Sequence, residues 1–298
     1  MKPKERSERL VPLLIEVQRA LDQEINLESL ASKFGSSSFH FHRMFSDAIG
    51  ETPKKHVERL RLERAASLLA VTDDLVLDVC LEVGFKNPET FSRNFRKFLG
   101  YSPTGYRRMA KIAQAERLQG TDFFGSDEYR LSRARFVTMP STPLLAMRKM
   151  GDYGVLNESF GHEDHVWNEL TRWAHQRDIR IDPVLMGLFY DDPTMTPPPL
   201  QRCDVCLPVD RIVDGTETVR CIHFDGGTYG VVEYIGRIKT IINAFRGLAD
   251  EIRRSDAYVF RDGPAVEFLR AANVDGVVGV HRITACFPVK NADKRRDP

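Results

Sequence analysis

Between Asn26 and Gly50 the apolar residues recur at helical spacing in two runs, separated by a short polar turn at residues 35–38. Asn26 is a residue type that often caps the start of a helix, and Gly50 suits the left-handed end of one. The apolar positions are Leu27, Leu30, Ala31 and Phe34, then Phe41, Phe45, Ala48 and Ile49. This spacing predicts a short helix, a tight turn and a second helix, which is the helix-turn-helix arrangement.

The same motif occurs again fifty positions later. FHRMFSDAIGETP begins at Phe41 and FSRNFRKFLGYSP begins at Phe91, and both fit F-x-R-x-F-x-x-x-[I/L]-G-x-[S/T]-P without gaps. The second copy has a short apolar face, a turn at residues 84–88 and a predicted buried stripe. These apolar positions are Leu77, Val79, Cys80 and Val83, then Phe91, Phe95, Phe98 and Leu99. We therefore predict two helix-turn-helix motifs, at about residues 27–49 and 76–99.

A long amphipathic segment connects the two motifs. Thr52-Pro53 places a capping residue before a proline, which is favoured at the first helical position. The apolar residues that follow are Val57, Leu60, Leu62, Ala65, Leu68 and Leu69. A helix here would hold the motifs at a fixed separation. Because DNA presents the same groove face about every 34 Å, one chain could then occupy two successive segments of the major groove.

Each predicted second helix leaves a polar face free. The residues on or near it are Phe39, His40, His42, Arg43 and Ser46 in the first copy, and Glu89, Thr90, Ser92, Arg93 and Arg96 in the second. Arginine can pair with guanine, glutamate can accept from cytosine, and an aromatic ring or threonine methyl can contact the thymine methyl. The alternative is a solvated face on a small helical domain, but two copies with matching Arg, Gly and Pro positions favour base reading.

Residues from about 10 to 110 resemble the AraC/XylS-type DNA-binding domain, which we expect to span residues 8–112. The motifs that carry the resemblance are Leu30-Ala31, Phe41-x-Arg43-x-Phe45, Gly50-x-Thr52-Pro53, Arg61-Leu62-x-x-Ala65, Gly84-Phe85, Phe91-Ser92-Arg93-x-Phe95 and Ser102-Pro103-x-x-Tyr106-Arg107. The resemblance implies base contacts from Phe39, His42, Arg43, Glu89, Thr90, Ser92 and Arg93, and phosphate contacts from Lys54, Lys55 and Arg96. Positions 88 and 89 vary in this family, so the target sequence does not transfer.

A second, weaker duplication occupies the back half of the chain, after a polar stretch at residues 119–128 that we interpret as a linker. RCDVCLPV at residues 202–209 resembles RITACFPV at residues 282–289. MRKMGDY and VEYIGRI, which begin at Met147 and Val232, also correspond roughly, and a helix-like segment follows each. Repeated strand-helix-strand-strand units predict an α+β domain with a central antiparallel sheet over residues 129–290. The chain is thus expected to be multidomain, with an all-α domain followed by an α+β domain.

This back domain resembles the GyrI-like effector-binding domain, and its combination with an AraC-type domain is similar to the Rob-type regulators. The resemblance implies a pocket between the repeats for an apolar, often cationic, small molecule. Glu267 matches the family's central pocket glutamate, and the corresponding residues 184–190 of the first repeat contain no acid. The aromatic candidates for this pocket are Tyr153, Trp167, Trp173, Tyr229 and Tyr234. The alternative is that these rings are ordinary core and that Glu267 faces solvent or a salt bridge.

Composition, charge and cysteine content limit the classes of protein to which this chain can belong. The 298 residues are 42% hydrophobic and 29% charged, typical of a globular protein, and no apolar run is long enough to span a membrane. Up to Leu118 there are 20 Lys and Arg against 16 Asp and Glu, and beyond it 23 against 26, so the front half is the more basic.

A charged N-terminus without a signal-peptide core indicates a cytoplasmic protein. Five scattered cysteines predict no disulfide framework, and Cys203-x-x-Cys206 lacks further ligands for zinc.

These features predict a sequence-specific transcriptional regulator that is not an enzyme and needs no metal or cofactor. The family resemblance implies that it is an activator. The expected partners are double-stranded promoter DNA, a small-molecule effector and RNA polymerase. Two alternatives stay open. One is a GyrI-like hydrolase that uses Glu267 as a base near an aromatic hydroxyl, and the other is a DNA-binding protein with little sequence preference.

Overall fold

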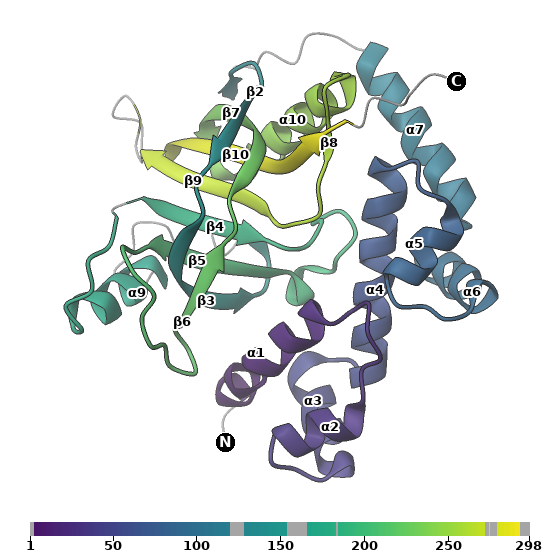
Figure 1. Cartoon of the computed structure of the whole chain (residues 1–298), viewed down its shortest axis with the longest axis vertical. Helices are drawn as coiled ribbons and strands as arrows, with labels where there is room; N and C mark the ends of the chain where they lie inside the picture. Colours follow the sequence, from purple (N-terminus) through teal and green to yellow (C-terminus); the bar gives the residue numbers. More distant parts are fainter. Residues whose placement is uncertain are drawn as a thin grey trace. The chain divides into compact units, whose positions relative to one another are not determined.

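The computed structural model describes residues 3–119, 128–153, 166–182, 184–271, 274 and 279–292. The chain divides into two compact units, an N-terminal unit of residues 1–116 and a C-terminal unit of residues 117–298 (Figure 1). Of the predicted linker, residues 120–127 lie outside the described part of the chain. Within the described ranges, no helix is both long and apolar enough to cross a membrane.

Every regular element described in the N-terminal unit is a helix. The helices are α1 (Pro3–Arg19), α2 (Leu27–Lys33), α3 (Ser38–Ile49), α4 (Pro53–Val71), α5 (Val76–Glu82), α6 (Pro88–Leu99) and α7 (Pro103–Gln119). Helices α2 and α3 form the first helix-turn-helix motif, α5 and α6 form the second, and α4 connects them (Figure 1). The prediction of an all-α first domain with two such motifs is confirmed.

The two motifs use the same kinds of residue at their helix boundaries. Ser37 caps α3 and Asn87 caps α6, and each side chain accepts a hydrogen bond from the backbone N–H three residues further on. Both helices end on a glycine in the left-handed region, Gly50 at φ 81° and Gly100 at φ 80°. A side chain would strain the backbone there. The fifty-residue sequence repeat is therefore a repeat of helix starts and stops.

Aromatic rings in equivalent positions fill the core behind α3 and α6. The ring centroids are 5.8, 5.7 and 5.5 Å apart along Phe34, Phe41, Phe45 and His56, and 5.3, 5.5 and 5.6 Å apart along Phe85, Phe91, Phe95 and Tyr106. The rings are tilted or edge-on, as aromatic pairs prefer. Each second helix thus packs on its motif through one face, which leaves the opposite face outside the core.

Two positions that the pattern assigned to the buried face are exposed. Leu77 is 49% exposed, because α5 turns Val79 and Cys80 inward and a helix this short has one narrow buried side. Phe98 is 36% exposed and lies in the last turn of α6, beyond the rings of Phe91 and Phe95. The predictions for these two side chains were wrong, although the helices themselves are present.

In the C-terminal unit, the described strands join into one antiparallel sheet. The strands are β1 (Tyr129–Leu131), β2 (Arg135–Met139), β3 (Thr142–Met150), β4 (Leu185–Phe189), β5 (Arg202–Pro208), β6 (Arg220–Phe224), β7 (Gly227–Arg237), β8 (Tyr258–Phe260), β9 (Ala265–Ala271) and β10 (Val280–Asn291). Their order is β1-β7-β10-β9-β4-β5-β3-β6, with β2 also on β7 and β8 also on β10. The remaining elements are α9 (Val166–His175), α10 (Ile242–Arg254) and the 3₁₀ turns η1 (Pro198–Leu200) and η2 (Ile238–Thr240).

The sheet consists of two repeats of the same connection. One repeat is β3-α9-β4-β5 and the other is β7-α10-β9-β10, and the strands β4 and β9 pair where the repeats meet (Figure 1). Helix α9 packs on β3 and β5, and α10 packs on β7 and β10. The strand pairing places both helices on the same face of the sheet. This arrangement confirms the predicted α+β fold with duplicated strand-helix-strand-strand repeats.

The turn at Gly226-Gly227 does not form a β-hairpin, because the strands on either side of it do not pair with each other. The strand β6 pairs with β3, whereas β7 pairs with β2, β10 and β1, so the turn carries the chain to another part of the sheet. A Cβ atom on Gly226 would lie 2.5 Å from the Met139 carbonyl oxygen, at the end of β2. Only glycine lets these two segments approach so closely.

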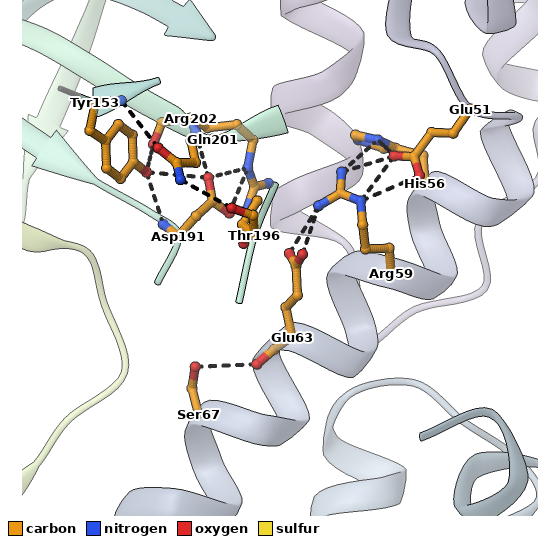
Figure 2. Close-up of polar contacts among 10 residues, drawn as sticks. All are labelled: Glu51, His56, Arg59, Glu63, Ser67, Tyr153, Asp191, Thr196, Gln201 and Arg202. Carbon is orange, nitrogen blue, oxygen red and sulfur yellow. Dashed lines mark hydrogen bonds and ion pairs between the residues drawn. The ribbon is translucent and has the colours of Figure 1, made fainter. Parts of the chain in front are cut away.

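A buried ion cluster joins the end of the first motif to α4 (Figure 2). The guanidinium of Arg59 donates to carboxylate oxygens of Glu51 and Glu63, at 2.9 Å in each case, and Nδ1 of His56 lies 2.8 Å from Glu51. Burial alone would raise the pKa of Glu51, but the hydrogen bonds and charges of His56 and Arg59 lower it below its usual value. The cluster therefore depends on one shared cation between two carboxylates.

We expect Arg59→Met to lower the free energy of unfolding of the N-terminal unit by about 3–5 kcal/mol, because it removes the cation shared by the buried Glu63 carboxylate and the partly buried Glu51 carboxylate. Urea unfolding followed by the helical circular dichroism of the full chain measures this. Lys111→Met is the matched control, since the Lys111–Asp73 ion pair is exposed and contributes about 0–1 kcal/mol. Equal small losses of unfolding free energy in both variants would contradict the stabilising role that we assign to Arg59.

Candidate nucleic-acid interface and effector pocket

The residues predicted to read bases in the first motif lie on the exposed face of α3. Phe39 is 83% exposed, and His42 and Arg43 are exposed beside it, three and four positions further along the helix. Residues at this spacing are neighbours on a helix surface. Exposure of a whole phenylalanine ring is costly in water, so this face suits a partner that covers the ring.

The second motif presents the equivalent face of α6. Glu89, Arg93 and Arg96 are exposed, and Thr90 and Ser92 are partly exposed. Arg93 occupies the position of Arg43 in the sequence repeat, between the two buried phenylalanines of its helix. Glu89 also lies in the first turn, where its charge complements the helix dipole and has a structural role whether or not it contacts a base. We call α3 and α6 the reading helices.

Lys54 lies in the first turn of α4 and is exposed, as is Lys55. That turn contains no acidic residue, and its N-terminal peptide groups carry a partial positive charge. Two cations at a helix start are well suited to a phosphate group. The chemistry of this surface is therefore two guanidinium-bearing helix faces with basic residues beside them, which is the pattern of a duplex-binding surface.

A pocket opens on the helix-covered face of the C-terminal sheet. Its described lining is Trp167 of α9, Leu185 and Gly187 of β4, Ile238 of η2, Glu267 and Leu269 of β9, and His281 and Ile283 of β10. It thus draws on both repeats and lies where β4 and β9 pair. A mostly apolar lining with one carboxyl and one imidazole is typical of a small-molecule site.

Strand register explains why Glu267 faces an open space. Its direct neighbours are Gly187 on β4 and Ala285 on β10, and neither has a side chain long enough to cover the carboxyl. A Cβ atom on Gly187 would lie 2.7 Å from the Phe189 ring, so a larger residue does not fit at that position. The first repeat therefore contributes space where the second contributes an acid.

The Glu267 carboxyl is held in an apolar setting. Burial raises its pKa from the usual 4.5 to about 8, and no hydrogen bond to it is found among the residues that the structure describes. The side chain retains some solvent contact through the pocket. Burial also lowers the pKa of His281. Near neutral pH, the pocket therefore favours the uncharged form of both groups.

Of the aromatic residues predicted for this pocket, Trp167 belongs to the described lining. The structure places Tyr153 in a separate polar network, in which its hydroxyl donates to the Arg202 carbonyl at 2.6 Å and lies 3.3 Å from Asp191 (Figure 2). Burial raises the pKa of Tyr153 above its usual range. This hydroxyl is already used to hold the ends of β4 and β5 together.

Tyr229 is also placed elsewhere. It is buried on the opposite face of the sheet from Glu267, where its ring packs on Phe224 at 5.5 Å and on the Arg261 guanidinium at 5.4 Å. Tyr234 is buried with its hydroxyl bonded to the Arg237 carbonyl, and Trp173 packs on Arg177. The described lining contains no tyrosine, so it lacks the aromatic hydroxyl that the hydrolase alternative requires.

His281 is the polar pocket residue that the sequence reasoning missed. The signal was present, because RITACFPV was recognised as the last strand of the second repeat. In a strand every second residue shares a face, so His281 and Ile283 lie on the same face as Ala285, the partner of Glu267. If the predicted strand had been extended by one residue and paired with the strand that contains Glu267, His281 and Ile283 would both have been predicted to line the pocket.

Comparisons with known proteins agree with both halves of this description. Residues 30–109 match a helix-turn-helix domain model, and residues 134–290 match the model of the GyrI-like small molecule binding domain. The chain is 30% identical over 229 residues to the transcriptional regulator Rob of Salmonella typhimurium LT2, and 29% identical over 229 residues to the right origin-binding protein of Escherichia coli K12. Each match covers 75% of this chain and 77% of the relative. The DNA-binding domain of AdpA, solved in complex with a target DNA, is 32% identical over 36% of this chain and 97% of that one, with a TM-score of 0.32.

The raised pKa of Glu267 predicts a pH-dependent stability. Between pH 4.5 and about 8 the folded protein keeps a proton that the unfolded chain has lost, so this group lowers the free energy of unfolding by up to about 1.4 kcal/mol per pH unit as the pH rises. Glu267→Gln removes that loss. The variant should therefore gain stability over the parent chain at pH 8.5 relative to pH 5.5, as measured by urea unfolding. Glu169→Gln, on the exposed side of α9, serves as control, and a Glu267→Gln effect that is the same at both pH values would refute the prediction.

Proposed function

The chain belongs to the Rob-type transcriptional regulators, with an AraC-type helix-turn-helix domain and a GyrI-like domain, and from this we propose that it reads two successive major-groove segments of a promoter and responds to a small effector. The observation that carries the first part is the structural repeat of the reading helices. Each has the same caps, the same aromatic core and an exposed arginine at the same position. A single exposed basic helix could be an ordinary solvated surface, whereas two equivalent ones joined by α4 favour bipartite recognition.

Within each motif we assign base contacts to Phe39, His42 and Arg43, and to Glu89, Thr90, Ser92 and Arg93. Lys54 and Arg96 would contact phosphates and set the register without reading sequence. Phosphate contacts supply most of the salt-dependent affinity, while base contacts supply the preference for one sequence over another. The two classes are therefore separable by comparing specific with random duplexes.

We further propose that the protein is a cytoplasmic activator that acts with RNA polymerase at its promoters. The support is the name of the Salmonella relative, a transcriptional regulator, and the intact pair of reading helices. The Escherichia coli relative is named for binding an origin, so occupancy of a DNA site without transcription is the competing outcome. Transcription from a template that carries the selected site, with purified polymerase, distinguishes the two.

For the effector we propose an apolar molecule with a positively charged nitrogen or phosphorus. The pocket offers apolar walls, a tryptophan and one buried carboxyl that lacks a cation. Such a ligand would supply the missing charge, and the carboxyl would release its proton as the cation binds. Affinity should therefore rise with pH until the carboxyl is ionised without the ligand, at about pH 8.

Selection of random duplexes by the full chain at physiological salt tests the DNA part. We expect recovery of two short conserved blocks about one helical turn apart. Arg43→Ala and Arg93→Ala should each weaken binding to the selected duplex by about 1–3 kcal/mol, with a smaller effect on random DNA. Arg211→Ala removes the same charge from an exposed loop of the C-terminal unit and should change neither. Equal losses on selected and random DNA would replace base reading with phosphate contact.

Binding of tetraphenylphosphonium, followed by calorimetry at pH 7 and pH 8, tests the effector part. Glu267→Gln should weaken the affinity at least about tenfold, which corresponds to about 1.4 kcal/mol. Glu169→Gln removes a carboxylate from the exposed side of α9 and should leave binding unchanged. Binding that is insensitive to both Glu267→Gln and pH would rule out a carboxylate-based cation site.

A further inference from the structure

One side chain on α4 contacts segments that belong to both helix-turn-helix motifs. The guanidinium of Arg61 donates from Nε to the Leu21 carbonyl at 2.8 Å and from Nη2 to the Gln23 carbonyl at 2.6 Å. Both carbonyls lie in the segment that leads from α1 into α2 of the first motif. A guanidinium can satisfy two acceptors at once because its donors form a rigid fork. Arg61 therefore ties α4 to the entrance of the first motif.

The second motif meets Arg61 at the same place. Gly84, in the turn between α5 and α6, has φ +88°, and a Cβ atom on it would lie 2.3 Å from the Leu21 oxygen and 2.9 Å from the guanidinium carbon of Arg61. The turn of the second motif thus packs directly on the carbonyl that Arg61 holds. This contact requires glycine both for its left-handed backbone and for its lack of a side chain.

Other contacts between these segments are weaker or more distant. Lys86 and Glu24 join the same turn to the same α1–α2 segment at 2.8 Å, but both side chains are about 80% exposed, and such pairs contribute little. Arg64 joins α4 to α5 through Glu82 at 3.4 Å, with 28% and 44% of the two side chains exposed. Among these contacts, the partly buried convergence of Leu21, Arg61 and Gly84 is the one that couples both motifs through α4.

This convergence bears on DNA because the two reading helices must match the helical repeat of the duplex. Helix α4 has 19 residues and is about 28 Å long, and the chain then turns at residues 72–75 before the second motif. Helices α5 and α6 also pack on α4, and the Arg61 contact adds a tie to the first motif that opposes rotation at that turn, which would change the separation and phase of α6 relative to α3. An error of one base pair rotates a groove site by roughly a tenth of a turn.

We propose that Arg61 is a positioning residue that sets the spacing between the two DNA segments this protein reads. The inference rests on the proposed two-segment reading. It assigns to Arg61 no contact with DNA, and it makes Gly84 its structural partner. The competing interpretation is that Arg61 only stabilises the fold, in which case its loss lowers binding to every duplex alike.

The test uses the full chain and duplexes that carry the two selected blocks at the native spacing, one base pair closer and one base pair further apart. A duplex with the first block alone reports on the fold and on base reading by α3. We expect the parent chain to prefer the native spacing at least about tenfold. Arg61→Lys keeps a charge but lacks the fork, so its spacing preference should fall to below about threefold while single-block affinity stays within about twofold.

Gly84→Ala provides a second, independent variant, because its Cβ atom pushes on the Leu21 carbonyl and should also reduce the spacing preference. Arg64→Lys is the matched control on α4 and should keep it. If the parent chain discriminates spacing and Arg61→Lys discriminates equally well, the proposal fails while two-segment reading stands. A uniform loss on all duplexes, single block included, would also overturn it, since that is the behaviour of a fold-stabilising residue. A parent chain that ignores spacing would overturn both this proposal and two-segment reading.

Discussion

Burial of two phenylalanines four residues apart is the constraint on which each half of the DNA-binding unit depends. Phe41 and Phe45 hold α3, and Phe91 and Phe95 hold α6, with an additional ring on either side. A helix that commits one face to such a stack leaves the opposite face in solvent at a defined orientation. The exposed arginines and the bare Phe39 ring are therefore consequences of the core as much as features of a binding surface. Each of the two helices ends on a glycine in the left-handed region, where a side chain would strain the backbone.

Among the residues that the structure describes, several buried ionisable groups are paired with an opposite charge, whereas the Glu267 carboxyl is not. Arg59 is shared by two carboxylates in the N-terminal unit, and in the C-terminal unit Arg148 binds Asp204 at 2.6 Å with Arg220 beside it. Burial opposes ionisation of Asp204, but Arg148 outweighs it and lowers the pKa to about 2. Glu267 has no such partner among the described residues, and its pKa moves the other way. Full compensation suits structural clusters, while an uncompensated carboxyl in a pocket suits a ligand that brings the charge.

Both units are built by duplication, and in both the function depends on where the copies differ. The reading helices share their boundaries and core but differ at the exposed positions, where Phe39 in one corresponds to Glu89 in the other. The sheet repeats share their connections, but Gly187 faces Glu267 across the central strand pair. A symmetric pair of acids there would repel each other when ionised, whereas a glycine opposite an acid creates room for a ligand. Arg61 differs from these positions, because it acts between the copies.

The sequence by itself determined the features that depend on local periodicity and backbone chemistry. Helix spacing, caps, glycine stops and the fifty-residue repeat predicted both motifs, and alternating strands with two internal repeats predicted the α+β domain. It also singled out Glu267 and Trp167. The tertiary structure determined the contacts between residues that are distant in the sequence, which periodicity does not encode. Strand pairing across distant segments put His281 beside the Glu267 pocket and sent Tyr153 and Tyr229 elsewhere, and helix packing exposed Leu77 and Phe98. The guanidinium of Arg61 reaches carbonyls about forty positions away in the chain, and no local pattern reports a contact whose partners are backbone atoms.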